Sequence, residues 1–161
     1  MVDLKWCLKL NKGIDIVEPS QNMCNSYLSM AEESLYMIEK NAESRIWTAS
    51  TSYYTMYYSL YALMMKIGIK SDIHSCSIAF MKHMLNEFYE SKYVQLIEEA
   101  FKLRNNLQYY PGSLIDDKDI NHIKEGARDF FVLSKEIISK IREKEIKEIR
   151  NKLDKLKYNK D

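Results

Sequence analysis

Apolar side chains recur every three or four residues through most of this chain, and few helix breakers interrupt the pattern. Its 161 residues include only 4 Gly and 2 Pro, too few for the repeated tight turns of a β-sandwich or barrel. The periodicity predicts helices over about 20–38, 45–67, 75–88, 91–109 and 117–156. We therefore expect an all-α fold, an up-and-down bundle of four main helices plus one shorter helix.

The two ends of the chain differ from its middle. We expect residues 1–19 to form a leader that packs on the bundle, 20–142 to form the bundle, and 143–161 to form a charged helical extension with an excess of basic residues. That extension has two interpretations. It is either a solvated helix that overhangs the bundle or a short basic arm that contacts a partner or nucleic acid.

Charge and cysteine content restrict the class of protein. A formal net charge of +1 argues against nucleic-acid binding through a bulk positive field, although a local patch stays open. The longest apolar stretch, about 53–65, is too short to cross a bilayer, and charged residues interrupt the first ten positions, which make a poor signal peptide. Cys7, Cys24 and Cys76 show neither metal-binding nor disulfide spacing, so we expect reduced thiols. These features predict a cytoplasmic protein without membrane contact.

The common catalytic and cofactor motifs are absent from the sequence. There is no Gly-rich phosphate loop, no Gly-x-Ser-x-Gly elbow and no His-Glu-x-x-His pair. A di-iron bundle needs histidines three residues after a Glu, and His74, His83 and His122 do not meet that condition. We therefore expect no metal and no cofactor, and any site to be metal-independent.

Arg104 is the residue that most suggests a site. In the predicted helix over 91–109 it lies in the middle of an apolar stripe, between Ala100 and Leu107. A guanidinium stays charged, so it is costly on an apolar face unless another group hydrogen-bonds it. That group is a carboxylate of the same chain, a residue across a subunit interface, or a bound anion such as phosphate.

Tyrosines are concentrated in the second predicted helix. Five of the 12 lie within nine residues, at positions 53, 54, 57, 58 and 61, and their spacing of four places them on two adjoining helix faces. One interpretation puts one face in the core and the other in a subunit interface; the alternative is a stacking surface for a purine or an unpaired base. His74 just precedes the third predicted helix, as a polar cap or as part of an anion site.

Taken in order, these residues resemble a known family. The run 52–63, then Gly68, then His74-Ser75, and then the segment from Leu103-Arg104 to Gln108-Tyr109-Tyr110 are similar to the HEPN (higher eukaryote and prokaryote nucleotide-binding) family. The likeness covers about residues 20–142 and is closest to the small stand-alone archaeal and bacterial members. It implies a helical bundle that pairs as a homodimer, and many such proteins act with a minimal nucleotidyltransferase as toxin and antitoxin.

In active members, the resemblance implies a metal-independent RNase with an Arg followed, after four to six residues, by a His. The His moves the proton of a ribose 2′-hydroxyl while the Arg stabilises charge on the phosphorane. This chain departs from that motif, because Tyr109, Tyr110 and Pro111 stand where the His would be, and Gln108 replaces an Asp common in stand-alone members. A phenol with a pKa near 10 is a poor base at pH 7, which favours binding over catalysis.

The resulting hypothesis is a homodimeric module that binds a nucleotide or an RNA phosphate in a cleft around Arg104. The expected binding residues are Arg104, Gln108, Tyr109, Tyr110, His74 and Tyr54, and the expected dimer-interface residues are Tyr53, Tyr57 and Leu107. Two alternatives stay open. One is a non-catalytic partner of a minimal nucleotidyltransferase, with the tyrosine face and the basic extension as protein-binding surfaces; the other is a weak metal-independent RNase that uses Arg104 and His74.

Overall fold

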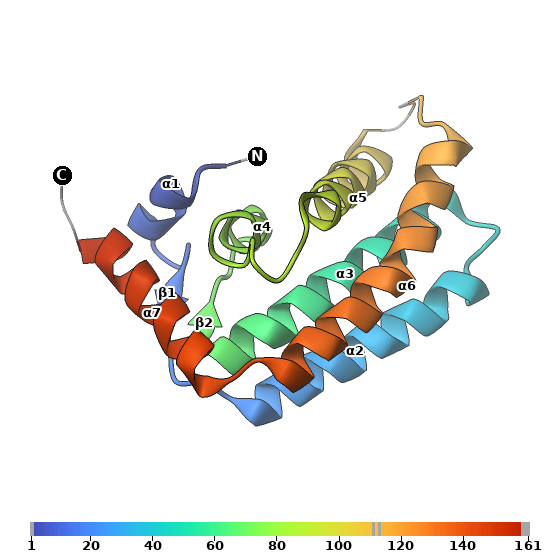
Figure 1. Cartoon of the computed structure of the whole chain (residues 1–161). Coiled ribbons are helices and arrows are strands. Elements are labelled where there is room, and N and C mark those ends of the chain that lie inside the picture. Colours follow the sequence, from blue (N-terminus) through green and yellow to red (C-terminus); the bar gives the residue numbers. More distant parts are fainter. Residues whose placement is uncertain (1, 111, 113, 159–161) are drawn as a thin grey trace.

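The computed structural model describes residues 2–110, 112 and 114–158, which form a helical bundle (Figure 1). Its elements are α1 (Leu4–Lys9), β1 (Asp15–Ile16), α2 (Gln21–Lys40), α3 (Arg45–Ile67), β2 (Ile69–Lys70), α4 (His74–Met84), α5 (Ser91–Tyr109), α6 (Asp117–Lys140) and α7 (Glu143–Tyr158). The all-α prediction is confirmed, since α2, α3, α5 and α6 are the four long helices and α4 is the shorter one. Pro111, one of the residues at the positions of the HEPN motif His, lies outside the described residues.

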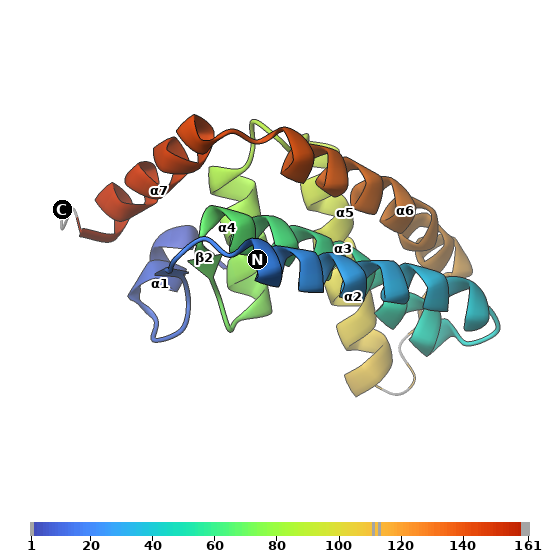
Figure 2. The same ribbon diagram turned by 90° about the horizontal axis from the view of Figure 1, so that it is seen from below.

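Helix α3 is the centre of the bundle and is buried on nearly all sides, through apolar and small hydroxyl side chains. Buried residues occur in every turn from Thr48 to Ile67. A helix of this kind must be surrounded by other elements, and α2, α5 and α6 pack around it. Helices α2 and α6 run beside α3, whereas α4 and α5 cross it (Figure 2). No helix in the described part of the chain, α3 included, is both long and apolar enough to cross a membrane.

Local side-chain signals set the ends of α2 and α3. Ser20 Oγ accepts a hydrogen bond from the Met23 N–H at the start of α2, and Ser44 Oγ accepts one from the Trp47 N–H at the start of α3. Helix α3 ends at Gly68, whose φ of 81° is in the left-handed region that favours glycine. Serine at a helix start and glycine at a helix end are common end signals, so the local sequence agrees with these ends of the two helices.

The single helix expected over 117–156 is two helices. Ile141 adopts an extended conformation, and the backbone N–H of Arg142 donates to a carboxylate oxygen of Glu145 at 2.8 Å. A side chain three residues along that satisfies the first free N–H favours the start of a new helix at this point. As a result α7 turns back toward α1 and the β1–β2 pair (Figure 1).

Helix α7 does not overhang the bundle, which contradicts the first interpretation of the C-terminal extension. Its residues Ile149 and Leu153 are buried. The side chains of Arg150 and Lys157 donate to backbone carbonyl oxygens of the leader, at Val17 (2.7 Å) and Ile14 (3.1 Å). The leader and α7 therefore pack on each other.

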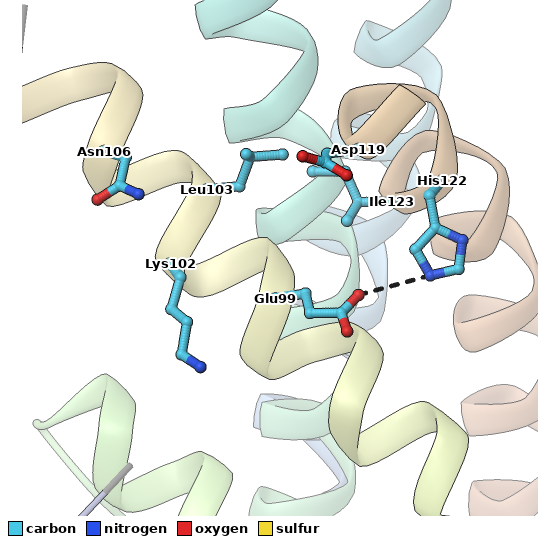
Figure 3. A pocket seen from close by; sticks show the side chains of 7 residues that line it. All are labelled: Glu99, Lys102, Leu103, Asn106, Asp119, His122 and Ile123. Atoms are coloured by element: carbon cyan, nitrogen blue, oxygen red, sulfur yellow. Dashed lines mark ion pairs between the residues drawn. The ribbon is translucent and has the colours of Figure 1, made fainter. Parts of the chain in front are cut away.

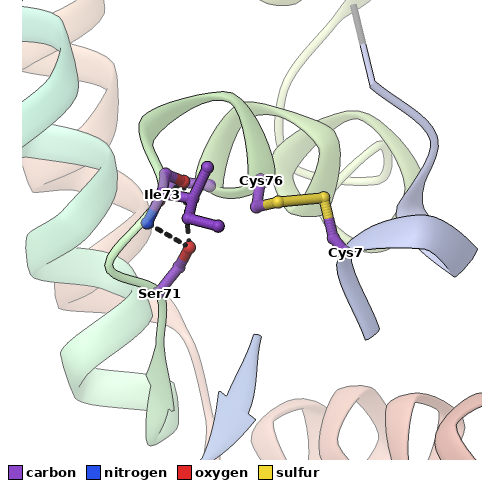
Figure 4. The surroundings of a disulfide bond; sticks show 5 residues. Cys7, Ser71, Ile73 and Cys76 are labelled. Carbon is purple, nitrogen blue, oxygen red and sulfur yellow. Dashed lines mark hydrogen bonds between the residues drawn. A yellow bond between two sulfur atoms is a disulfide. The ribbon is translucent and has the colours of Figure 1, made fainter. Parts of the chain in front are cut away.

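A disulfide joins Cys7 of α1 to Cys76 of α4 (Figure 4). Cys24 is a buried free thiol. The prediction of reduced thiols is therefore wrong for Cys7 and Cys76. The paired cysteines are 69 positions apart, so no local spacing relates them, and they meet only because α1 packs against α4. The bond fastens the leader to the helix that begins at His74.

Candidate functional site

Two polar contacts join α5 to α3 on consecutive turns of each helix. The Arg104 Nη2 donates to the Tyr54 hydroxyl at 2.7 Å, and the Gln108 Nε2 donates to Ser50 Oγ at 3.0 Å. Arg104 and Gln108 are four residues apart on α5, as are Ser50 and Tyr54 on α3, so each pair shares a helix face. The two helices thus meet through side chains that sequence spacing alone could not pair.

The guanidinium of Arg104 is half-buried among aromatic rings. Its carbon lies 5.3 Å from the centroids of both the Tyr53 and Tyr54 rings, within the range of a cation–π interaction. Its Nη1 donates to Asn105 Oδ1 at 2.6 Å, while its buried Nε has no hydrogen-bond partner. Across the described ranges, Arg104 forms no ion pair with a carboxylate. A carboxylate of the same chain is therefore not what compensates this charge in the described residues.

His74, the first residue of α4, joins the same group of side chains. Its Nδ1 lies 2.7 Å from the Tyr53 hydroxyl, and its ring stacks on Tyr57 with centroids 4.0 Å apart and planes 11° apart. Burial and, second, the positive charge of Arg104 lower the pKa of His74 to about 4. The imidazole is therefore neutral at pH 7, with one donor and one acceptor nitrogen. We call Arg104, Tyr53, Tyr54, Tyr57 and His74 the Arg104 cluster.

The tyrosines of α3 are of two kinds. Tyr53 and Tyr57 are 0% and 6% exposed within one chain, and burial raises the pKa of both phenols far above its usual range. Rings this enclosed offer little surface to a second chain, and their assignment to a dimer interface stays a prediction. Leu107, assigned with them, is half-buried. Tyr54 and Tyr58 are also half-buried and stack on each other with centroids 5.3 Å apart.

Tyr109 and Tyr110 lie at the end of α5, where they are 67% and 64% exposed. Five residues separate Tyr109 from Arg104, which is a rotation of about 140° around a helix, so the two side chains leave α5 in different directions. Tyr110 follows the last helical residue. Of the six expected binding residues, the structure thus brings Arg104, Tyr54 and His74 together, and places Gln108 one turn further along α5.

Asn105 and Ser50 take part in the site but were missed by the sequence analysis. Asn105 accepts from Arg104, and Ser50 accepts from Gln108. Ser50 could have been found from its spacing of four residues from Tyr54, whereas nothing in the sequence distinguishes Asn105 from other surface amides. Both are neutral, so they orient the two donors without cancelling the positive charge of Arg104.

A separate cavity of about 240 Å³ lies between α5 and α6, where Glu99 Oε2 is 3.5 Å from His122 Nε2 (Figure 3). Asp119 and Lys102 also line it. Within the residues that the structure describes, no three His, Cys, Asp or Glu side chains gather closely enough to hold a metal ion. Leu103 lines this cavity on the α6 side of α5. The next residue, Arg104, contacts Tyr54 of α3, so the cavity is separate from the Arg104 cluster.

The Arg104 cluster offers a fixed cation, a neutral imidazole and one half-buried phenol ring, Tyr54, which stacks on the half-buried ring of Tyr58. This combination suits an anion that carries a flat group, because the guanidinium attracts the charge and the rings can stack. Comparisons of the chain with models of protein families, with curated proteins and with solved structures found no match.

Proposed function

We propose that this protein is a HEPN-like homodimeric module that binds a nucleotide or an RNA phosphate at the Arg104 cluster. The observation that carries the proposal is a half-buried guanidinium whose Nε has no partner and which no carboxylate of the described residues neutralises. Nε itself is buried in the single chain, so a bound phosphate would compensate the charge at the half-buried, accessible part of the guanidinium. The resemblance of residues 20–142 to the HEPN family favours the same ligand class.

Aromatic rings beside Arg104 support a ligand that carries a base. Tyr54 and Tyr58 stack on each other, with planes 23° apart, and both are only half-buried. Stacking on an aromatic side chain contributes about 1–3 kcal/mol per base and tolerates any base sequence. We therefore expect a nucleotide to bind more tightly than inorganic phosphate.

An exposed apolar strip next to the Arg104 cluster supports the homodimer. On α3, Trp47 lies seven residues before Tyr54 on the same helix side and is 57% exposed. On α2, Tyr27 contacts Tyr58 of α3, and Met30, less than one turn further, is 40% exposed. Burial of such a strip by a second copy would bring two Arg104 side chains toward one shared cleft.

Calorimetry with AMP, ATP and a short single-stranded RNA tests the binding site. We compare the wild type with Arg104→Met and with Lys102→Met, a control that removes a cation from the other side of α5. Loss of a charge-assisted hydrogen bond costs about 1.5–3 kcal/mol, or about 10- to 150-fold in Kd. Arg104→Met should weaken binding by that factor and Lys102→Met by less than about twofold. Equal affinities in the two variants, or no binding by the wild type, would refute the site.

Sedimentation velocity tests the dimer separately. The wild type should sediment as a dimer, and Trp47→Glu should shift it to a monomer, because a charge on an apolar interface costs desolvation energy. Lys102→Glu places the same carboxylate outside the strip, with a net-charge change of −2 instead of −1, and should stay dimeric. A monomeric wild type contradicts the shared cleft.

A second candidate, a weak metal-independent RNase, is favoured by the position of His74 in the same cluster as Arg104. A neutral imidazole can accept a proton at pH 7, although a pKa of about 4 makes it a weak base. Labelled RNA incubated with a chelator should then be cleaved slowly by the wild type and not by His74→Gln or Arg104→Met. Cleavage that persists in either variant rules this reaction out.

A further inference from the structure

A groove lies well away from both the Arg104 cluster and the cavity between α5 and α6. It has a volume of about 510 Å³ and is formed by the start of α2, the end of α3 and the first turns of α7, with Lys66, Lys147 and Arg150 among its lining residues. Lys66 is twelve residues beyond Tyr54 on α3, a separation of about 18 Å along a helix. The two places are therefore independent, and we call this one the basic groove.

Arg150 is held firmly at the basic groove by the backbone around it. Its Nη1 lies within hydrogen-bond distance of the carbonyl oxygens of Val17 (2.7 Å), Ile67 (3.0 Å) and Gly68 (2.9 Å). Gly68 makes room for it, because a Cβ at this position would collide with Nη1. The guanidinium thus also compensates the negative end of α3. Within the described residues, Arg150 Nε and Nη2 donate no hydrogen bond. These two groups are donors that a ligand could use.

Within the described residues, none of the cations of the basic groove has a carboxylate partner, whereas Lys144 and Lys157 of α7 do. Among the described residues, no ion pair engages Lys66, Lys147 or Arg150; Lys66 Nζ instead donates to the amide oxygen of Gln21 at 2.7 Å. Elsewhere on this helix, Lys144 pairs with Glu148, and Lys157 pairs with Asp15. Lys152 and Lys155 of α7 also form no ion pair within the described residues, so what distinguishes the basic groove is that three such cations line one hollow.

The charge of the basic groove matches a particular kind of ligand. Three cations and one carboxylate, Glu143, give a formal charge of about +2, which matches a phosphomonoester dianion at pH 7. Ile141 and Ile146 form an apolar part of the lining that can contact carbon atoms of the ligand. We infer that the basic groove is a binding site for a small phosphomonoester with an apolar body, separate from the Arg104 cluster.

Phenyl phosphate, with inorganic phosphate for comparison, is the probe for this site. All measurements use the full chain with Arg104→Met, so that loss of the Arg104 cluster cannot be mistaken for loss of the basic groove. In that background, phenyl phosphate should bind with a lower Kd than inorganic phosphate, because only it has an apolar part. Lys147→Met should raise the Kd for phenyl phosphate at least tenfold. Lys147 is exposed, so its replacement should leave the fold intact.

Lys144→Met is the matched control, since Lys144 is an exposed cation of the same helix that does not line the groove. It should change the Kd by less than twofold. The inference is overturned if phenyl phosphate does not bind, or if both lysine variants weaken it equally, which would indicate bulk charge alone. Circular dichroism of each variant confirms that the helices are retained.

Discussion

Reduction of the bond between Cys7 and Cys76 should lower the stability of this protein by a large fraction. The bond closes a loop with a sequence separation of 69 residues, from α1 to α4. Breaking it leaves the same side chains in the folded state but gives the unfolded chain more conformations. The chain-entropy relation for a loop of this size gives about 4.4 kcal/mol at 25 °C. Domains of this kind have a total free energy of unfolding of about 5–15 kcal/mol.

Urea unfolding of oxidised and reduced protein measures this difference directly. Both sulfur atoms belong to residues that are 0% exposed, so reduction is done in denaturant and followed by refolding with the reductant present. With an m-value of about 2 kcal/mol/M, the midpoint should fall by about 2 M. Cys24→Ala, which removes the free thiol, should show the same redox difference, while Cys7→Ser with Cys76→Ser should show none.

Two results would refute this reasoning. One is an equal midpoint for the oxidised and reduced wild type. The other is alkylation of three free thiols in the protein purified without reductant, as counted by mass spectrometry. A loss of only about 1 kcal/mol would indicate that the unfolded chain is already compact near α1 and α4, so that the bond restricts it little.

Three further perturbations test other parts of the structure. Gly68→Ala should destabilise the protein by more than about 2 kcal/mol in thermal unfolding, because a φ of 81° costs alanine about 1–2 kcal/mol and the added Cβ would collide with the Arg150 guanidinium. Gly112→Ala is the control: its φ is 91°, but nothing lies within 4 Å of the added Cβ, so it should cost only the conformational part. Tyr89→Phe should lower the free energy of unfolding by about 1–2 kcal/mol, because it removes a fully buried hydrogen bond of 2.8 Å to Ser134 Oγ. The pKa of His74, followed by NMR, should be about 4, against 6.5 in the unfolded chain. Between these pH values the unfolded state binds more protons, so the free energy of unfolding should fall as the pH is lowered from 6.5 to 4. An NMR pKa near 6.5 would contradict the burial of this ring.

Helix positions were predictable where side chains mark the ends, and were not where the apolar pattern continued across a break. Ser20, Ser44 and Gly68 mark ends of α2 and α3, and both helices lie where the sequence placed them. The break between α6 and α7 was missed because apolar residues resume after Arg142. The available signals were the five-residue step from Ile141 to Ile146 and the capping contact of the Glu145 carboxylate with the Arg142 N–H, which spacing alone does not reveal.

The candidate site was predictable only where the signal lies within a single helix. Arg104 was identified because one charge interrupts an apolar stripe on its own helix. Its approach to His74 depends on how α3, α4 and α5 pack, and no periodicity within one helix encodes that arrangement. The burial of Tyr53 and the pairing of Cys7 with Cys76 likewise depend on which elements become neighbours.

The contacts of α7 bear on how small a version of this protein could be made. Arg150 supplies the donor for carbonyl oxygens at both the leader and the end of α3, and Lys157 binds the leader as well. A fragment cut after Lys140 would leave those oxygens to water and would lose the buried side chains of Ile149 and Leu153. The leader and α7 therefore stabilise each other. We expect the shortest fragment that unfolds cooperatively to extend from α1 through α7.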